Sequence, residues 1–232
     1  MLMCASLPAA PDKTHVMYPG TVVRAWPESE MQRGLAFVSE EVSRRHGRAG
    51  QFVRIRLGEA ENPYALASEP GSPELELLIK PETELTTAMS KLVPGDAFLV
   101  GAAQGKGFPV SEHEGQDLIL CAAGTGIAPL RAVVRSLLPS RARFGQVLLF
   151  YGQRTKAHFA YSGEHDAWRA AGIELHLVAS EGGKRLQHAV RDRHPDTERA
   201  CAYLCGMKGM VTDLAHILGE LGLPRDRVFL NY

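Results

Sequence analysis

Cys121-Ala122-Ala123-Gly124-Thr125-Gly126-Ile127-Ala128-Pro129-Leu130 joins a run of apolar residues to a segment with helical spacing. Gly124 and Gly126 can take backbone angles that are closed to other residues, and they let a ligand approach the main chain. Pro129 suits the first turn of a helix, where free amides and the helix dipole attract a pyrophosphate. The stretch therefore predicts a strand, a turn and a helix that bind a nucleotide. The alternative is a tight turn without a ligand.

The same turn departs from the usual dinucleotide-binding fingerprint at two points. Pro129 stands where that fingerprint has its third glycine. The next apolar run ends in Tyr151-Gly152-Gln153-Arg154, without the acidic residue that would bind a ribose hydroxyl. We therefore expect something other than the ordinary dehydrogenase of this kind.

Buried strands and helices alternate beyond residue 115. Leu118–Ala123 is a continuous apolar run, which is typical of a strand buried on both faces of a parallel sheet. Helical spacing follows at Leu130, Val133, Val134, Leu137 and Leu138. Further strands are expected at 147–151, 173–178, 202–205 and 228–230, with helices at 165–171 and 207–221. This alternation predicts a doubly wound α/β domain.

The first half of the chain indicates strands instead. Gln51–Leu57 alternates strictly, with Val53, Ile55 and Leu57 on one side, as in a strand with one buried face. Other strands are expected at 21–25, 35–38, 75–80 and 97–100, with a turn at Pro27–Ser29. The basic run Arg44–Arg48 is interpreted as a solvated hairpin loop, with an anionic ligand or partner as the alternative. Short strands at this spacing predict a small antiparallel barrel or sandwich, with a boundary near 111–116.

Composition excludes several classes of function. The 232 residues include 26 Lys+Arg and 26 Asp+Glu, and without a basic excess we expect no nucleic-acid partner. Cys4, Cys121, Cys201 and Cys205 are too scattered for a zinc or iron–sulfur site, so no metal is expected, and isolated cysteines indicate a reduced, cytoplasmic protein. There is no signal-peptide pattern and no run of roughly 20 apolar residues, so no membrane association is expected.

Seven motifs together resemble the ferredoxin–NADP reductase superfamily in their order and spacing. They are Gly50–Val53, Pro63–Ser68, Leu92–Asp96, Gly105–Phe108, Gly124–Pro129, Tyr151–Thr155 and Leu204–Met210. The resemblance covers about residues 18–232 and is greatest to the compact branch that includes the dihydroorotate dehydrogenase electron-transfer subunit and plant proteins of the kiwi-fruit type. It implies a β + α/β fold, in which residues 1–17 form a flexible arm, 18–112 a six-stranded antiparallel flavin-binding β-barrel, and 113–232 a doubly wound NAD(P)-binding domain.

The resemblance also implies a function. A hydride would pass between NAD(P)H and a bound flavin, with FAD expected, and electrons would go on to an unidentified acceptor, for which a small redox protein is a candidate. Cys205, beside Gly206, would lie near the nicotinamide, and the terminal Tyr232 would stack on the flavin. The alternatives are a structural cysteine and a tail that packs on the surface. The remaining cofactor-binding residues would be Tyr64, Ala65, Leu66, Ala67, Ser68, Ile79, Lys80, Thr86, Thr87, Gly124, Thr125, Gly126, Ile127, Ala128, Pro129, Arg154, Gly206 and Met207.

The flavin motif departs from the family pattern Arg-x-Tyr-Ser. Asn62 replaces the arginine that neutralises phosphate, and Ala65 replaces the serine near the flavin ring. Arg54 or Arg56, on the preceding strand, could compensate. Thr86 and Thr87 are expected at a helix start that faces the flavin pyrophosphate, with a plain helix cap as the alternative.

The choice between NADH and NADPH stays open in the sequence. Glu181 would repel a 2′-phosphate, whereas Lys184, Arg185 and Arg154 would attract one, and the balance slightly favours NADH. Three other readings remain. The chain could be an electron-transfer subunit of a larger complex, a nucleotide-binding module that has lost its flavin, or a nucleotide-binding α/β protein without a redox role. The absence of a cysteine cluster argues against the pyrimidine-pathway subunit in particular.

Overall fold

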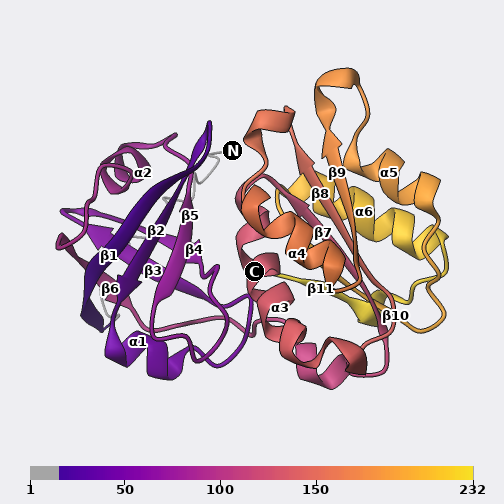
Figure 1. Ribbon diagram of the computed structural model, residues 1–232, viewed down its shortest axis with the longest axis horizontal. Coiled ribbons are helices and arrows are strands. Elements are labelled where there is room, and N and C mark those ends of the chain that lie inside the picture. The colour runs from indigo at the N-terminus through magenta and orange to yellow at the C-terminus, as the bar shows by residue number, and fades with distance from the viewer. Residues whose placement is uncertain (1–15, 232) are drawn as a thin grey trace, which may run out of the picture.

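The computed structural model describes residues 16–231, which form two sheets side by side (Figure 1). The first sheet and its helices are β1 (Met17–Ser29), β2 (Gln32–Val38), α1 (Glu40–Arg45), β3 (Phe52–Leu57), β4 (Ala60–Ala65), β5 (Leu75–Ile79), α2 (Glu84–Met89) and β6 (Ala97–Gly101). The second comprises β7 (Asp117–Ala123), α3 (Ile127–Leu137), β8 (Val147–Gln153), α4 (His165–Ala170), β9 (Ile173–Ala179), α5 (Leu186–Arg193), β10 (Ala200–Cys205), α6 (Lys208–Glu220) and β11 (Val228–Leu230).

The first sheet has six antiparallel strands in the order β4-β3-β6-β1-β2-β5. The Ala67 amide donates to the Glu76 carbonyl at 2.8 Å, which ties the chain after β4 to β5 and draws the two ends of the sheet together. Val53 and Ile55 are fully buried inside it, as the alternation in β3 predicts. The six-stranded antiparallel architecture expected for this half is confirmed.

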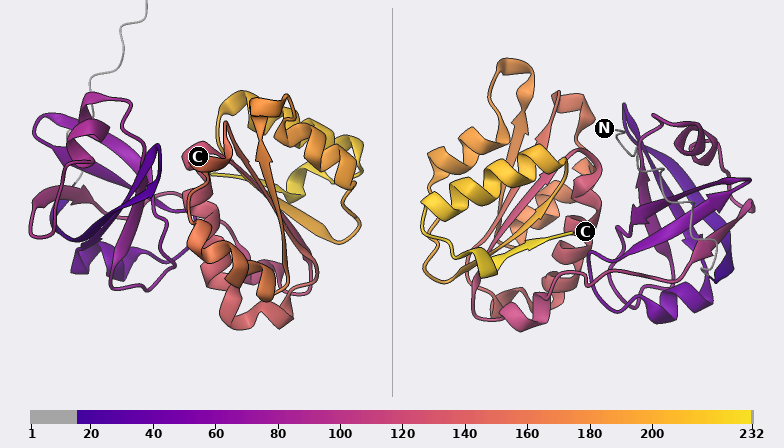
Figure 2. Two further views of the ribbon diagram at one scale, coloured as in Figure 1. Left: turned by 45° about the horizontal axis from the view of Figure 1, so that its top comes forward. Right: turned by 180° about the vertical axis from the view of Figure 1, so that it is seen from behind.

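The second sheet has five parallel strands in the order β11-β10-β7-β8-β9. Helices α3 and α4 cover one face and α5 and α6 the other (Figure 2), so the doubly wound prediction is also confirmed. The chain first builds outward from β7 through β8 to β9 and then returns to place β10 on the other side of β7. The order therefore reverses between β7 and β10, which is where ligands bind in sheets of this kind.

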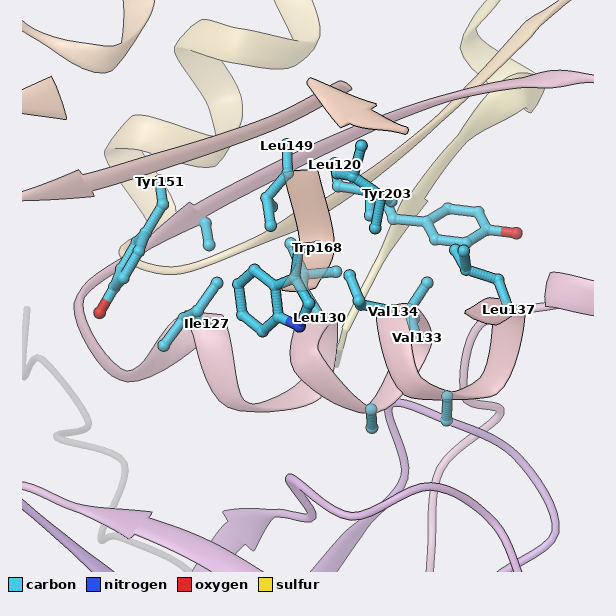
Figure 3. Packing of buried hydrophobic residues seen from close by; sticks show 14 of the residues in the cluster. Leu120, Ile127, Leu130, Val133, Val134, Leu137, Leu149, Tyr151, Trp168 and Tyr203 are labelled. Atoms are coloured by element: carbon cyan, nitrogen blue, oxygen red, sulfur yellow. The ribbon is translucent and has the colours of Figure 1, made fainter. Parts of the chain in front are cut away.

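Helix α3 is buried around most of its circumference. Ile127, Leu130, Val134 and Leu137 pack toward the sheet and Trp168 of α4 (Figure 3). The opposite side of α3 faces the first sheet, so that every residue from 127 to 134 is buried. The helix that follows the glycine turn is therefore the element on which the two halves meet.

Phe108 forms a second packing contact between the two halves of the chain. Its ring stacks on Tyr203 of β10, with 4.7 Å between the ring centroids and 14° between the planes. On the other side it lies against Gly50, whose φ is +89° and where a Cβ atom would come within 2.6 Å of the Phe108 ring. His113 Nδ1 lies 2.6 Å from the Tyr203 hydroxyl oxygen. The Gly105–Phe108 motif thus delivers an aromatic ring into the space between the two sheets.

Several local expectations were wrong. Pro27–Ser29 belongs to β1, and the turn falls at Glu30 and Met31. Strand β4 was not expected. It is an edge strand that pairs only with β3, so Pro63 costs it no central hydrogen bond. Helix α5 was also not expected, because its mostly polar sequence does not show which of its faces is buried.

The basic run 44–48 is not simply a solvated loop. Helix α1 ends at Arg45, and the next residue, His46, is only 2% exposed. Burial lowers the pKa of His46 from 6.5 to about 4, because the charged imidazolium would lose its hydration. The run therefore begins in the last turn of α1, and the imidazole ring of its third residue, His46, is buried in the protein.

This buried imidazole should make stability depend on pH. The unfolded chain takes up a proton near pH 6.5, whereas folded His46 resists it down to about pH 4. Stability is then full above pH 6.5 and falls as pH drops through that window, by about 2 to 3 kcal/mol between pH 7 and 4.5. Urea unfolding at the two pH values should show a smaller loss in His46→Leu than in the wild type. The exposed-histidine variant His188→Gln should behave as the wild type, and a parallel loss in all three proteins would contradict the assignment.

The first strand begins at Met17, one residue before the boundary expected for the first domain. The predicted arm, apart from its last two residues, lies outside the described residues. The division into 18–112 and 113–232 stays a prediction. Among the helices described between residues 16 and 231, none is long and apolar enough to cross a membrane.

Candidate functional site

A cleft of about 1180 Å³ lies between the two sheets. Ala123, Gln153, Val178 and Cys205, at or next to the carboxyl ends of β7, β8, β9 and β10, line one side of it. It therefore opens at the edge where parallel sheets bind ligands, beside the reversal of strand order. Its volume exceeds the usual range of about 300–1,000 Å³ for small-molecule sites, so it has room for a large ligand or for two adjoining ones.

The wall contributed by the first sheet is largely apolar. Pro63, Tyr64 and Ala65 come from the end of β4, and Leu78 comes from β5. Burial raises the pKa of the Tyr64 phenol, so it is neutral at physiological pH. Lys80 follows β5 as the cation of this wall and forms an ion pair with Glu82. A flat aromatic ligand with a phosphate-bearing tail suits such a surface.

The glycine turn forms the opposite wall. Gly124 has φ +60°, and the position of a Cβ atom there is empty within 4 Å, so a ligand can approach the backbone. Residues 124–126 form one 3-10 turn that leads directly into the 11-residue helix α3. The backbone of this turn and the positive dipole end of α3 therefore lie at the cleft, as expected for an anion site.

Gly126 is required for a different reason. A Cβ atom there would lie 2.4 Å from the carbonyl oxygen of Cys205 and 2.9 Å from the amide nitrogen of Gly206. Both contacts are to backbone and cannot be relieved by turning a side chain. The turn after β7 and the turn after β10 thus touch, which fixes Gly124–Gly126 against Cys205–Gly206.

Cys205 and Gly206 lie at the centre of the cleft. Burial raises the pKa of the Cys205 thiol to about 11, so the thiol is protonated at neutral pH, and Asn231 Nδ2 lies 4.0 Å from its sulfur. Gly206 has φ +150°, and a Cβ atom there would meet Met210 Cε at 2.5 Å. Met207 is 74% exposed at the rim. The position offers a neutral, polarisable thiol beside a closely packed glycine turn.

The far end of the cleft is polar. It is lined by Arg154, Ser180, Gly183, Arg185, Gln187 and Asp213. Within residues 16–231, Arg154 and Arg185 make no ion pair, whereas Lys184 pairs with Asp192 at 2.9 Å. Gln187 Nε2 donates to Asp213 at 3.1 Å. Glu181, expected to repel a 2′-phosphate, does not line the cleft.

The structure brings together thirteen of the residues singled out from the sequence. Those lining the cleft are Tyr64, Ala65, Lys80, Gly124, Thr125, Gly126, Ala128, Pro129, Arg154, Arg185, Cys205, Gly206 and Met207. Six others do not line it and are Leu66, Ala67, Ser68, Ile79, Thr86 and Ile127; Thr87 is exposed and also outside it. Leu66, Ala67 and Ile79 are buried under the wall, and Ser68 Oγ accepts from the Glu76 amide. Tyr232 lies outside the described residues.

The threonines of α2 are placed differently from the expectation. Thr83, not Thr86, is the N-cap, and the Thr83 hydroxyl accepts from the Thr86 amide. Thr86 Oγ1 in turn accepts from the amides of Glu82 and Thr83, which makes a reciprocal capping box. The alternative of a plain helix cap therefore describes Thr86, and its hydroxyl is already engaged within the protein.

The compensating arginines are also engaged. Arg56 Nη2 lies 2.6 Å from a Glu61 carboxylate oxygen, and Arg54 Nη1 lies 3.4 Å from the other. Glu61 is directly opposite Arg56 in the β3–β4 ladder. Because β4 was not expected, this cross-strand pairing could not be anticipated. Neither arginine lines the cleft.

Sequence reasoning missed Pro63, Leu78, Gln187, Met210 and Asp213 as cleft residues. Leu78 reads as an ordinary strand residue, and its exposure to the cleft depends on how the two sheets meet. Gln187 lies on α5, which was itself missed, and Asp213 faces it from α6. Only their position along the chain could have indicated these residues. Residues at the ends of parallel strands and in the first turns of the following helices gather at one edge of the sheet, where ligands bind.

Residues 120–216 match the family model described as the oxidoreductase NAD-binding domain. Two similar curated proteins are sulfhydrogenase gamma subunits of Pyrococcus furiosus. Subunit gamma of sulfhydrogenase 1 is 35% identical over 62% of this chain and 48% of its own length, and that of sulfhydrogenase 2 is 30% identical over 78% and 61%. The chain thus spans only about half to three-fifths of these relatives. Ferredoxin–NADP reductase B of Sorangium cellulosum is 26% identical over 92% of this chain and 96% of its own length.

Solved structures agree on the fold. The cytochrome P450 reductase GcoB of Amycolatopsis superposes with a TM-score of 0.81 at 22% identity, covering 94% of this chain and 70% of that one. A ferredoxin–NADP reductase of Neisseria gonorrhoeae, solved with FAD and NADP, has a TM-score of 0.77 at 21% identity, covering 92% and 97%. At these identities the likeness shows the architecture of both sheets and their order along the chain.

Proposed function

We propose that this chain, which belongs to the ferredoxin–NADP reductase-like oxidoreductases, passes reducing equivalents between NAD(P)H and an FAD held in the cleft between its two sheets. The observation that carries the proposal is the meeting of three surfaces in one cleft. These are the apolar wall at Tyr64, the glycine turn at Gly124–Gly126, and Cys205–Gly206.

Each wall suits one of the two ligands. The start of α3 would hold the pyrophosphate of the nicotinamide nucleotide, because its amides and dipole favour an anion. Tyr64 and Leu78 would flank the flavin ring, and Lys80 would face its phosphates. Bound there, FAD would supply a ring that accepts a hydride from the nicotinamide. Gly206 lets the turn after β10 pack closely against Ala123 and Met210, and the protonated Cys205 thiol adds no charge to the cleft.

The residues present fit a flavin at the ring more closely than at the phosphates. Pro63, Tyr64 and Leu78 provide an apolar surface, while Asn62 and the self-capped Thr86 leave Lys80 as the nearest cation of that wall. Replacing the charged partner at position 62 should weaken the phosphate contact by about 1.5 to 3 kcal/mol. FAD is therefore expected to bind reversibly rather than to remain fixed through purification.

The visible spectrum tests the proposal. Addition of FAD to the protein should shift the flavin absorbance bands and quench the flavin fluorescence, and NADH or NADPH should then bleach the bound flavin without oxygen. An FAD spectrum and fluorescence unchanged by the protein would contradict the flavin, and bound flavin that neither nucleotide bleaches would contradict the transfer.

The arginines at the far end of the cleft favour NADPH. Arg154 and Arg185 have no ion-pair partner within the described residues, and Glu181, the basis for a preference for NADH, does not line the cleft. Arg185→Ala should raise KM for NADPH by roughly 10-fold or more, as expected when a charged hydrogen bond is lost, and change KM for NADH little. Steady-state rates with both nucleotides measure this, with Lys184→Ala, already paired with Asp192, as the control. Equal effects on the two nucleotides would remove Arg185 as the phosphate contact.

The electron acceptor is a separate proposal. The sulfhydrogenase relatives are named as subunits, and another relative is named as the electron-transfer subunit of dihydroorotate dehydrogenase B of Desulforamulus reducens, 28% identical over 75% of this chain. These names favour a second candidate, in which the chain works inside a larger complex and hands electrons to a neighbouring redox protein. The division at 112/113 and a cytoplasmic location, the latter suggested by isolated cysteines, are likewise proposals.

A further inference from the structure

Arg131 is a charged residue buried at the junction of the two halves. It lies on α3, five residues after Gly126, and is only 3% exposed. A fully buried arginine is retained only where its donors find partners. Its partners here come from both sheets, so it is placed to act on the cleft without touching a ligand.

On the side of the first sheet, Arg131 holds the segment that follows the ring-binding wall. Nη1 donates to the Ala67 carbonyl at 3.1 Å and to the Glu76 carboxylate at 2.6 Å. Ala67 is three residues after Tyr64, and its own amide donates to the Glu76 carbonyl. The guanidinium therefore closes a small network that includes the end of β4 and the start of β5.

On its own side, Arg131 is fixed by a separate set of contacts. Nε and Nη2 donate to one Glu164 oxygen at 2.8 and 2.5 Å, and the guanidinium carbon lies 4.4 Å from the centre of the Tyr161 ring. The Tyr161 amide donates to Glu28 of β1 at 2.6 Å, which is a second link between the halves. The planar guanidinium group of Arg131 is thus held in one orientation by contacts on three sides.

We propose that Arg131 is a positioning residue that sets the separation between the wall at Tyr64 and the turn at Gly124–Gly126. This inference rests on the proposed function. The path is short, from Tyr64 through Ala67 to the guanidinium and then along the first turn of α3 to Gly126. Hydride transfer needs reacting atoms about 3 to 3.5 Å apart, so a small increase in this separation would slow the step while leaving each ligand its own contacts.

Arg135 provides a matched control. It is one turn further along α3, is 30% exposed, and shares the carboxylates of Glu76 and Glu164 at 3.5 and 3.2 Å. Arg135 also donates to Glu69 at 3.3 Å, so it too reaches the segment after β4, but it makes no hydrogen bond to the Ala67 backbone. Loss of charge alone should therefore affect Arg135→Gln and Arg131→Gln alike, whereas loss of the positioning contact should affect Arg131→Gln only.

The experiment compares wild type, Arg131→Gln, Arg131→Lys and Arg135→Gln as FAD-loaded protein. Stopped-flow reduction over a range of NADPH and NADH concentrations gives the limiting rate and the nucleotide dissociation constant separately. Arg131→Gln should lower the limiting rate by roughly 10- to 100-fold and change the dissociation constant less than about twofold. Arg131→Lys should recover part of the rate, because an ammonium can reach one partner but not all three. An unchanged limiting rate, or an equal loss in Arg135→Gln, overturns the proposal.

A second readout does not depend on the reaction. Hydrogen exchange of the flavin-free proteins, followed by mass spectrometry, reports the amides of residues 64–68. Arg131→Gln should exchange faster there than wild type, and Arg135→Gln should match wild type. If no protein is reduced by either nucleotide, the proposed function fails, yet unchanged protection at 64–68 would still overturn the positioning role. If Arg131→Gln does not fold, the same two comparisons are made with Arg131→Lys.

Discussion

We expect the Gly126→Val protein to keep its FAD and to lose reduction of that FAD by NAD(P)H by roughly 100-fold or more. The reason is the close contact between two turns. A Cβ atom at position 126 would lie 2.4 Å from the Cys205 carbonyl oxygen, so the start of α3 and the end of β10 must move apart. That movement displaces Gly206 together with the amides proposed to bind the nucleotide, whereas the substitution removes no side chain from the wall at Tyr64.

Anaerobic mixing with NADH and NADPH, followed through the flavin absorbance, measures the loss. Gly219→Ala is the control, because a Cβ atom at that position on α6 meets nothing within 4 Å. It should be reduced at the wild-type rate. Reduction of Gly126→Val at that rate would show that the nucleotide does not use this turn.

The second large effect should be on stability. Phe108→Ala should lower the free energy of unfolding by about 3 to 5 kcal/mol, because it empties a fully packed site between Tyr203 and Gly50. Both halves lose a contact, so we expect their unfolding to become less cooperative as well. Urea unfolding followed separately by circular dichroism and tryptophan fluorescence measures both changes.

Two further variants make this result specific. Tyr203→Phe keeps the stacked ring but removes the hydroxyl paired with His113, and it should cost about 1 to 3 kcal/mol. Leu99→Ala removes an apolar side chain that is already 42% exposed, and it should cost least. A cost for Phe108→Ala no larger than that for Leu99→Ala would mean that the ring does not join the two halves.

Local periodicity was enough to predict most of the fold. The alternation in 51–57 and the apolar run 118–123 depend only on which faces of a strand are buried, and both became strands with the expected burial. Strand β4 was missed because its sequence, with Asn62-Pro63 at the centre, has low strand propensity. An edge position tolerates such residues, but whether a strand lies at an edge is decided by the whole sheet.

The residues of the candidate site likewise fall into those that a local sequence pattern or motif indicates and those that only the folded structure reveals. Gly124 and Gly126 could be predicted from the turn between a buried strand and a helix, whereas Cys205 and Gly206 are expected only from the family resemblance; all four line the cleft. Thr86 could not be placed, since its hydroxyl is satisfied by neighbours that only the start of α2 reveals. Arg131 carries no sequence signal at all. Its role becomes clear only in the structure, where the first sheet covers it and leaves it 3% exposed, whereas Arg135 on the same helix stays partly exposed.

The reciprocal cap formed by Thr83 and Thr86 has a consequence for the life of the protein. Because those amides already have partners within the chain, the start of α2 needs no bound phosphate to satisfy them. The newly made polypeptide should therefore persist in a colourless, folded form, and the coloured fraction should follow the ratio of free FAD to its dissociation constant. Redox competence would then rise and fall with the supply of the vitamin-derived coenzyme, without any change in the amount of protein.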